Sequence, residues 1–301
     1  MSAPSVTVVI VHWNQADRCV RTGHAFAAQA GVDVSLIVVD NGSVPGAVDR
    51  VVSGLPGAEV IRVGRNAGFG GAANVGLQHW LHRGVGEWVV VAPHDALPEG
   101  DCLRRLLDAV SARPRAGLAS AEYGEPGKPV VDRYFGGILI ERQRDDGWED
   151  AGHPHGTLLL ARRACLEEIG LFDERYFAYC EEADLGLRAG NAGWEVGVVW
   201  GAVVRNPSVS VRSEVAEYLM LRNSLLLVRD HFGRYPVFIR ICFALVNTTR
   251  LKLHPAARGP FFSFPARRRA LVDFLRGRFG PPPPELAVAE SGGQGIPAPV
   301  R

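Results

Sequence analysis

Three carboxylates lie close together in the stretch Phe177–Asp184, at the start of a predicted helix. Glu181 and Glu182 are adjacent, and Asp184 comes two residues later. A carboxylate in this position can act as a general base and take a proton from an attacking hydroxyl group. Acidic first turns also occur because they complement the helix dipole, and Asp184 has the i,i+4 spacing to pair with Arg188. The residue types alone leave both explanations open.

His94 and Asp95 form a second candidate group, in a turn bounded by prolines. An imidazole beside a carboxylate could present two ligands to a divalent cation. A turn that is merely capped by Asp95 would need no metal. The sequence therefore indicates a cation site here, with the capped turn as the alternative.

Polar and small residues follow two other apolar segments. Asp40 ends one of them and is followed by Asn41 and Gly42, so its carboxylate could accept a hydrogen bond from a sugar hydroxyl or a base N–H. A turn aspartate is an equally good explanation. The stretch Arg65–Asn74 (RNAGFGGAAN) opens a predicted helix that runs through Trp80. Its small residues let a ligand approach the backbone, and a helix N-terminus favours an anion such as a pyrophosphate.

Strands that alternate with helices must position these groups. Leucines and a valine recur at i, i+3, i+4 and i+7 in Asp101–Arg113, which predicts a helix there. The strand-length, β-branched segments are Ser5–His12, Val34–Asp40, Glu59–Val63 and Glu87–Ala92. Strands that are hydrophobic on both faces, with helices between them, predict an α/β fold with a mostly parallel sheet covered on both sides. In such sheets, ligands bind outside the carboxyl ends of the strands.

The second half of the chain continues the pattern and then becomes helical. It has predicted strands at Thr157–Ala161 and Glu195–Trp200, and predicted helices at Arg163–Ile169 and Glu181–Asn191. From Glu214 the pattern is helical up to a cap at Gly233, and an apolar segment with interspersed arginines follows at Pro236–Leu253. These features predict a domain over 1–232, a helical extension over 233–280 and a Pro/Gly-rich, disordered tail over 281–301.

Composition excludes several classes of protein. Hydrophobic residues make up 47% and charged residues 22% of the 301 residues, which excludes general disorder. The net charge of +1 provides no basic field for nucleic acid. The N-terminal apolar segment lacks the flanks of a signal peptide, and no run of roughly 20 apolar residues predicts a membrane span. The five scattered cysteines predict neither disulfides nor a thiolate zinc site, and indicate a cytoplasmic protein.

The motifs, in their order along the chain, resemble one large enzyme family. They are VTVVIVHWN (6–14), LIVVDNGS (36–43), RNAGFGGAANVGL (65–77), PHDALPEG (93–100), LLLARRACLEEIGLFDERYFAYCEEADLGLRAGNAGW (158–194) and AVVRNPSVS (202–210). This combination resembles the inverting, nucleotide-sugar-dependent glycosyltransferases of family 2, which have the GT-A fold, and notably their rhamnosyltransferase-like branch. The resemblance covers residues 5 to 232, in the order of the family.

The resemblance implies a Rossmann-like, nucleotide-sugar-binding sheet and a hexosyltransferase that uses a UDP- or dTDP-sugar. The acceptor would be a hydroxyl group of a glycan, a lipid-linked sugar or a small natural product. The implied donor-binding residues are Val11, Trp13, Asn14, Asp40, Arg65, Asn66, Gly68, Asn74, His94 and Asp95. The implied metal ligands are Asp95 and His94, and the implied catalytic residues are Glu182, as base, and Asp184. Glu182 would deprotonate an acceptor hydroxyl that attacks the anomeric carbon opposite the diphosphate, which inverts that centre.

Two residues depart from the pattern of the family. His94 stands where the acidic metal motif has an aspartate, and Asn206 replaces a histidine after the last matched strand. Both changes weaken the expected binding of Mn²⁺ or Mg²⁺, and an imidazole favours Mn²⁺. Arginines could instead neutralise part of the diphosphate charge, at positions 62, 65 and 205. No organic cofactor is implied.

The sequence also leaves other functions open. A nucleotide-sugar-binding protein with lost catalysis is one alternative. A dinucleotide-dependent oxidoreductase is disfavoured, because bulky His12 and Trp13 follow the first strand where its glycines belong. His153 and His155 could be metal ligands, but without a third they are expected to line an acceptor pocket or to cover a loop. Aromatic side chains could stack on an acceptor or pack in the core, at positions 148, 176, 177 and 179.

The C-terminal segment 236–253 could contact a membrane. It combines Ile239, Phe243, Leu245 and Val246 with arginines at positions 234, 240 and 250, as an interfacial helix at the inner face of the membrane would. An apolar face docked on the catalytic domain is the alternative explanation. The sequence is also compatible with a homodimer.

Overall fold

The computed structural model describes residues 3–206, 213–259 and 262–287. The chain forms two compact units. The first unit comprises Met1–Val130, Leu139–Glu174 and Glu182–Pro207, and the second comprises Val131–Ile138, Arg175–Glu181 and Ser208–Arg301. This division differs from the boundary at 232/233 expected from the sequence, because the helix before that boundary packs with the C-terminal helices.

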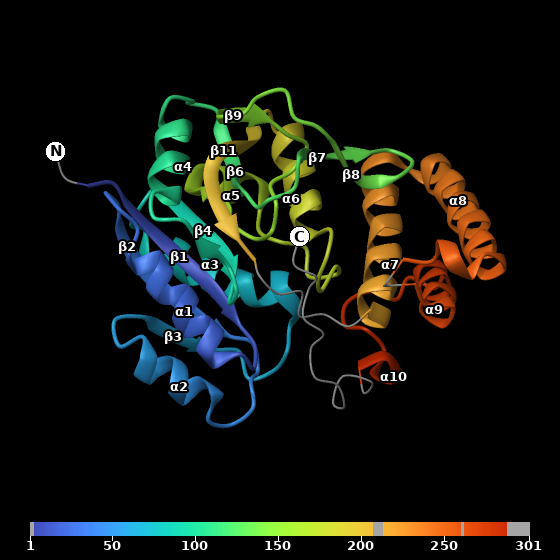
Figure 1. The fold of residues 1–301 in the computed structure, drawn as a ribbon, viewed down its shortest axis with the longest axis horizontal. Coiled ribbons are helices and arrows are strands. Elements are labelled where there is room, and N and C mark those ends of the chain that lie inside the picture. Colours follow the sequence, from blue (N-terminus) through green and yellow to red (C-terminus); the bar gives the residue numbers. More distant parts are fainter. Residues whose placement is uncertain (1–2, 207–212, 260–261, 288–301) are drawn as a thin grey trace. The chain divides into compact units, whose positions relative to one another are not determined.

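A nine-stranded sheet forms the centre of the first unit (Figure 1). Its order is β3-β2-β1-β4-β10-β6-β11-β5, and β9 pairs with β11. The bounds are β1 Ser5–His12, β2 Asp33–Asp40, β3 Glu59–Arg62, β4 Trp88–Pro93, β5 Leu97–Pro98, β6 Ala116–Glu122, β9 Gly147–Asp150, β10 Leu159–Arg162 and β11 Glu195–Arg205. Strands β3, β2, β1 and β4 are mutually parallel, β10 is antiparallel to β4 and β6, and β11 is parallel to β6. The predicted mostly parallel sheet is confirmed.

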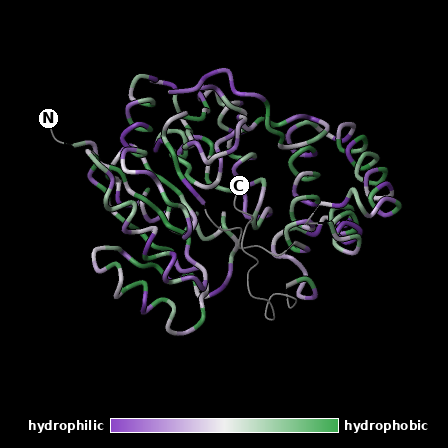
Figure 2. The backbone as a smooth tube through the Cα atoms, viewed as in Figure 1, coloured by the Kyte–Doolittle hydropathy of each residue, from purple (hydrophilic) through white to green (hydrophobic). Residues whose placement is uncertain are grey.

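Helices cover both faces of this sheet, because its strands carry apolar side chains on both sides. One face packs against α1 (Ala16–Ala27), α2 (Ala47–Gly54) and α4 (Cys102–Ser111). The other packs against α3 (Gly68–Arg83), α5 (Arg163–Ile169) and α6 (Glu181–Asn191). Alternate residues of β1 divide between the two cores: Val8 and Ile10 face the first, and Val9 and Val11 face the second. Figure 2 shows hydrophobic residues along these central strands.

Several strands between residues 116 and 150 were not predicted from the sequence. Strand β6 consists largely of small residues, because its neighbours leave little room: a Cβ at Gly117 would lie 2.8 Å from both Cys165 Sγ and Trp194 Cβ. Strands β7 (Gly127–Asp132) and β8 (Gly136–Glu141) pair with each other in a separate two-stranded sheet. The residues of β6, β7 and β8 are small or exposed, so their sequences do not show the alternation of apolar and polar residues that marks a strand.

The second unit is mainly helical. It contains α7 (Ser213–Phe232), α8 (Arg234–Leu253), α9 (Phe264–Leu275) and the short α10 (Pro284–Ala287). Residues of α7 and α9, among them Tyr218, Leu225 and Phe274, form its apolar core. Leu286 of α10 packs against this core, so the disordered tail expected from residue 281 is corrected for 281–287. The rest of that tail, 288–301, lies outside the described residues, as do 207–210 of the AVVRNPSVS motif.

Candidate active site

Three neighbouring strands of the first unit end at the same edge of the sheet. In the register of the sheet, His12 at the end of β1 is opposite Asp40 at the end of β2, and Val11 is opposite Pro93 at the end of β4. His94 follows directly, and its Nδ1 lies 3.3 Å from the carbonyl oxygen of Val11. The structure therefore brings Val11, Asp40 and His94 together, as expected.

The carboxylate of Asp40 is buried and held in place by two neighbours. His12 Nδ1 lies 3.2 Å from Asp40 Oδ1, and the Ser43 backbone N–H donates to both carboxylate oxygens, at 3.3 and 3.4 Å. Burial, reinforced by His94, lowers the pKa of the His12 imidazole. His12 is therefore neutral near pH 7, and its Nδ1–H donates to Asp40. Sequence alone does not indicate this role of His12, because it depends on the pairing of β1 with β2.

A network of amides fixes the loop that precedes α3. Asn41 Oδ1 accepts a hydrogen bond from the Ala67 N–H at 2.8 Å, and Asn41 Nδ2 donates to Asn66 Oδ1 at 3.1 Å. Asn66 Oδ1 also accepts from the Gly68 N–H at 2.9 Å. The network places the N-terminus of α3 next to the end of β2. A helix N-terminus there is a suitable site for a diphosphate.

Gly42 makes this approach of two loops possible. Its φ is +75°, and a Cβ at this position would lie 2.4 Å from the backbone carbon of Arg65. A larger residue would both strain the turn and push the two loops apart. The side chain of Arg65 is exposed, whereas Arg62 and Arg205 are ion-paired with Asp49 and Glu99.

Asn14, in the first loop, also contacts the segment after β2. Asn14 Oδ1 accepts a hydrogen bond from the Val44 N–H at 2.8 Å, and the Asn14 N–H donates to Ser43 Oγ at 2.9 Å. Asn14 has a φ of +58°, a conformation that asparagine tolerates better than most residues. Trp13 is exposed beside it. An exposed ring at a strand end could contact a flat nucleobase.

Asn74 makes its hydrogen bonds elsewhere, with the segment that follows α5. Its Nδ2 donates to the Phe172 carbonyl at 2.9 Å and to Glu174 Oε1 at 3.1 Å, and its Oδ1 accepts from the Phe172 N–H at 3.0 Å. The buried amide thus links α3 to the segment after α5. This link uses both ends of the amide, and the expected contact of Asn74 with the donor stays a prediction.

The two departures from the pattern of the family meet at one place. Asn206, directly after β11, donates from Nδ2 to Asp95 Oδ1 at 3.3 Å. His94 is buried, which lowers the pKa of its imidazole. Its Nδ1 is next to the Val11 carbonyl, and its Nε2 has no hydrogen-bond partner among the described residues. His94 and Asp95 thus offer one nitrogen and one carboxylate. Nowhere in 3–206, 213–259 or 262–287 do three His, Cys, Asp or Glu side chains gather to hold a metal ion.

Glu182 and Asp184, in the first turns of α6, have different surroundings. The Glu182 carboxylate faces Gly156, where a Cβ would lie 3.4 Å from Glu182 Oε1. Burial raises the pKa of the Glu182 carboxyl above its ordinary value. Asp184 Oδ2 accepts from Arg188 Nε at 2.9 Å, so the helical ion pair is confirmed. Of these two carboxylates, Glu182 has the properties of a proton acceptor.

A stacked pair of rings lies close to Glu182. The rings of Tyr123 and His155 are stacked, with centroids 3.3 Å apart. The Thr157 N–H donates to His155 Nδ1 at 3.2 Å, so the ring proton is on Nε2. Burial, with a contribution from His153, lowers the pKa of His155 to about 3. The expectation that His155 lines a pocket stays a prediction.

His153 and two of the aromatic residues are structural. His153 is buried, and a Cβ at Gly186 would lie 2.5 Å from His153 Cβ. Trp148 and Tyr176 are buried as well, so core packing is the better of the two explanations for them.

The loop that precedes Glu181 belongs to the second unit. Three of its residues have positive φ angles, which are rare for residues other than glycine. Phe177, Tyr179 and Cys180 have φ values of 66°, 69° and 74°. Asn223 of α7 holds this loop, because its Nδ2 lies 2.8 to 2.9 Å from the carbonyl oxygens of Tyr176, Ala178 and Tyr179. Asn223 is a further residue that supports the site, and a polar residue inside an apolar helical stretch is the signal in the sequence that indicates it.

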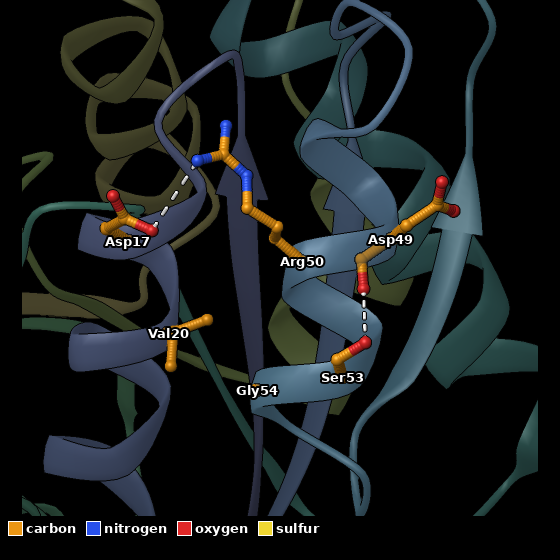
Figure 3. A pocket seen from close by; sticks show the side chains of 6 residues that line it. All are labelled: Asp17, Val20, Asp49, Arg50, Ser53 and Gly54. Atoms are coloured by element: carbon orange, nitrogen blue, oxygen red, sulfur yellow. Dashed lines mark hydrogen bonds and ion pairs between the residues drawn. The ribbon is translucent and has the colours of Figure 1, made fainter.

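A surface depression between α1 and α2 is not part of this group of residues (Figure 3). Its volume is about 480 Å³, and it is wide open to solvent. It contains an exposed ion pair between Arg50 and Asp17, 3.9 Å apart, and the Ser53 hydroxyl donates to the Asp49 carbonyl. None of the candidate residues lines it.

Comparison with known families identifies the chain. The sequence model of Glycosyl transferase family 2 matches residues 7–170. The chain belongs to glycosyl transferase family 2. As a member of this family it is an enzyme, a hexosyltransferase that moves a sugar from a nucleotide sugar to an acceptor.

A curated relative and two solved structures agree with membership in family 2. The relative, from Mycobacterium tuberculosis, is named N-acetylglucosaminyl-diphospho-decaprenol L-rhamnosyltransferase; it is 27% identical over 288 residues, which cover 81% of this chain and 89% of the relative. The mannosyltransferase PcManGT of Pyrobaculum calidifontis, in complex with GDP-Man and Mn²⁺, has a TM-score of 0.56 and 19% identity, with 94% of this chain and 78% of that chain covered. GalNAc-T7 with UDP, GalNAc and Mn²⁺ has a TM-score of 0.61 and 15% identity, with 90% and 54% covered. These two structures support the GT-A fold.

Proposed function

We propose that this family 2 enzyme is an inverting glycosyltransferase that moves a hexose from a UDP- or dTDP-sugar to the hydroxyl group of a lipid-linked sugar. The observation that carries the proposal is the Glu182 carboxylate, whose pKa burial raises at the start of α6. A base with a raised pKa holds the proton of an acceptor hydroxyl more readily. Attack by that hydroxyl forms the new glycosidic bond while the bond from the anomeric carbon to the diphosphate oxygen breaks. The hydroxyl proton goes to Glu182, the nucleoside diphosphate leaves, and the anomeric centre inverts.

The donor would bind at the ends of β1, β2 and β4. Asp40 would accept a hydrogen bond from the base or the ribose, and Val11, Trp13 and Asn14 would surround the nucleoside. Asn66, Gly68 and the N-terminus of α3 would face the diphosphate, whose charge the helix dipole favours. The exposed Arg65 guanidinium would neutralise part of the same charge.

The choice of acceptor depends on the mycobacterial relative. Its name specifies a lipid-linked acceptor and an L-rhamnosyl donor group, and the alignment covers most of both chains. We therefore propose a lipid-linked sugar acceptor and a rhamnosyl-type hexose. A cytoplasmic enzyme is part of the proposal, as the five scattered cysteines of the sequence indicate. Peripheral contact with the inner face of the membrane through 236–253 is part of this proposal. We also propose a homodimer, which sedimentation would test.

A screen of donor binding tests the proposal. We expect UDP- or dTDP-sugars to raise the melting temperature, and GDP-sugars to raise it less, in thermal-shift measurements with and without Mn²⁺. Incubation of the stabilising donor with a lipid-linked acceptor should then release the nucleoside diphosphate. Stabilisation by a nicotinamide dinucleotide, and by none of these sugars, would contradict the proposal.

A second candidate is a nucleotide-sugar-binding protein without catalysis. The replacement of the metal-motif aspartate by His94, together with Asn206, favours it. The two candidates differ in one measurement, because only an active enzyme releases nucleoside diphosphate from a bound donor.

A metal ion would be held mainly by the substrate. Asp95 and the free Nε2 of His94 could supply two ligands, and oxygens of the donor diphosphate would have to supply the others. The cation would offset phosphate charge in such a complex. The residues present thus fit a weak, donor-dependent cation site and not a preformed one.

After EDTA treatment, we expect Mn²⁺ to restore activity at a lower concentration than Mg²⁺, because imidazole is a poor ligand for Mg²⁺. The variant His94→Asp should lower the concentration of Mg²⁺ needed for half-maximal activity. Isothermal titration without donor should show no tight binding of either ion to the wild type. Full rescue of the wild type by micromolar Mg²⁺ would contradict this interpretation of the loop.

A further inference from the structure

Helix α8 of the second unit is apolar on two opposite faces. Its inner face contributes Val237, Ala244 and Thr248, which are buried in the second unit, where α8 packs against α7 and α9 (Figure 1). Its outer face carries five large side chains that are 50% to 70% exposed: Tyr235, Phe238, Leu245, Val246 and Leu253. The core of the unit therefore does not account for the outer side chains.

The five exposed side chains lie on one face of the helix, and we name them the α8 stripe. They follow one another at i, i+3, i+10, i+11 and i+18. At about 100° per residue, these positions fall within roughly 100° of the helix circumference. Scattered surface leucines need no explanation, but a contiguous apolar stripe along a whole helix marks a surface that binds something.

The charged residues of α8 and of the segments on either side of it are all positive. The sequence from His231 to Val272 contains no Asp or Glu, and eight Arg or Lys residues. Arg240 and Arg267 are used inside the unit, by Ser224 and Glu217. Arg234 and Lys252 are exposed along one edge of the stripe, and Arg250 is exposed along the other. An apolar stripe with cations on both edges matches a surface with an apolar interior and anionic head groups.

We propose that the α8 stripe binds the surface of an anionic phospholipid bilayer, with α8 lying in the plane of the interface. The apolar side chains would enter the boundary between head groups and acyl chains, and the flanking cations would contact lipid phosphates. Among the described helices, none is long and apolar enough to cross a membrane, α8 included. The inference rests on the proposed function in one respect: it explains how the enzyme meets a lipid-linked acceptor.

Vesicle flotation with the full-length protein tests this inference. We expect the wild type to float with vesicles of phosphatidylcholine containing phosphatidylglycerol, and to float less at high salt or with phosphatidylcholine alone. The variant Phe238→Ser/Val246→Ser/Leu253→Ser should lower the apparent affinity for anionic vesicles by about tenfold or more. Arg250→Glu/Lys252→Glu should lower it by about tenfold or more as well, since each cation contributes separately.

Matched controls come from exposed residues of the first unit. Val85→Ser and Arg21→Glu remove an exposed apolar group and an exposed cation far from α8 in sequence, and should leave flotation unchanged. Circular dichroism and donor binding should be the same for all variants, because the inner residues of α8 are retained. Since flotation needs no turnover, failure of the proposed glycosyl transfer would leave this result intact.

Three outcomes would overturn the inference. The first is a wild type that stays in the soluble fraction with anionic vesicles. The second is equal flotation with neutral and anionic vesicles, which would remove the role of the cations. The third is a dimer in analytical ultracentrifugation that the triple serine variant dissociates, with no flotation, because the stripe would then bind a second copy of the chain.

Discussion

Replacement of Glu182 by glutamine is expected to lower kcat by about 10²-fold or more, while the Kd of the donor sugar nucleotide stays nearly unchanged. Glutamine keeps the size of the side chain next to Gly156 but cannot accept a proton from the acceptor hydroxyl. Steady-state kinetics at saturating donor and acceptor measure the first quantity, and calorimetry with the donor measures the second. An effect on kcat alone is the signature of a group that acts in the transition state.

The dependence of kcat on pH provides an independent readout. Burial raises the pKa of Glu182, and the base must be deprotonated to work. Activity is therefore present above this raised pKa and is lost as the pH falls through it. The acid limb should lie at a higher pH than the pKa of an ordinary glutamate, and it should disappear in the residual activity of Glu182→Gln.

The neighbouring carboxylates are the matched controls for this variant. Glu181→Gln should lower kcat much less, since only Glu182 is proposed as the base. Asp184→Asn breaks the buried ion pair with Arg188, so it should lower the melting temperature more than it lowers kcat. If Glu182→Gln retains most of the activity and one of these two variants loses it, the base is assigned to the wrong carboxylate.

The parallel part of the fold could be predicted from local sequence alone. Strands β1, β2 and β4 are apolar on both faces, so their continuous β-branched runs are visible without any partner. The register of these strands then places Val11, Asp40 and His94 at one edge. This edge follows from the general rule that parallel strands of such a sheet end together.

Long-range partners could not be predicted in the same way. The amide of Asn74 pairs with Phe172, and Asn206 pairs with Asp95, across about a hundred residues of chain in each case. The local pattern of apolar and polar residues carries no information about such contacts. The Asn206–Asp95 bond follows only from the fold, which brings the end of β11 next to the loop after β4.

The boundary between the two units differs from the predicted boundary at 232/233, for a related reason. Helix α7 follows the first unit directly in sequence, and its helical pattern alone indicates no boundary before it. Its apolar residues instead pack against α9, as Tyr218, Leu225 and Phe274 show. Hydrophobic periodicity predicts that a helix has a buried face, but it does not identify the element that covers this face.

Replacement of Asp40 by alanine is expected to weaken binding of the donor nucleotide by about 1–3 kcal/mol, which is roughly 5- to 150-fold in Kd. The carboxylate is proposed to accept a hydrogen bond from the base or the ribose, and alanine leaves that donor group unpaired. Calorimetry with the free nucleoside diphosphate and with the sugar nucleotide should show the same loss, because the contact is to the nucleoside and not to the sugar.

The contact between Asp40 and His12 must be separated from this effect. Alanine also leaves the buried Nδ1–H of His12 without its acceptor, so Asp40→Ala should lower the melting temperature of the unliganded protein. Asp40→Asn keeps an oxygen for His12, so it should restore most of the melting temperature while still binding the nucleotide more weakly than the wild type. Asp49→Ala, at an exposed carboxylate of α2 that pairs only with Arg62 in the described contacts, is the control and should change neither quantity. Equal nucleotide affinity of wild type and Asp40→Ala would reduce Asp40 to a residue that supports the turn after β2, and the nucleoside would then have to bind through other residues at this edge of the sheet.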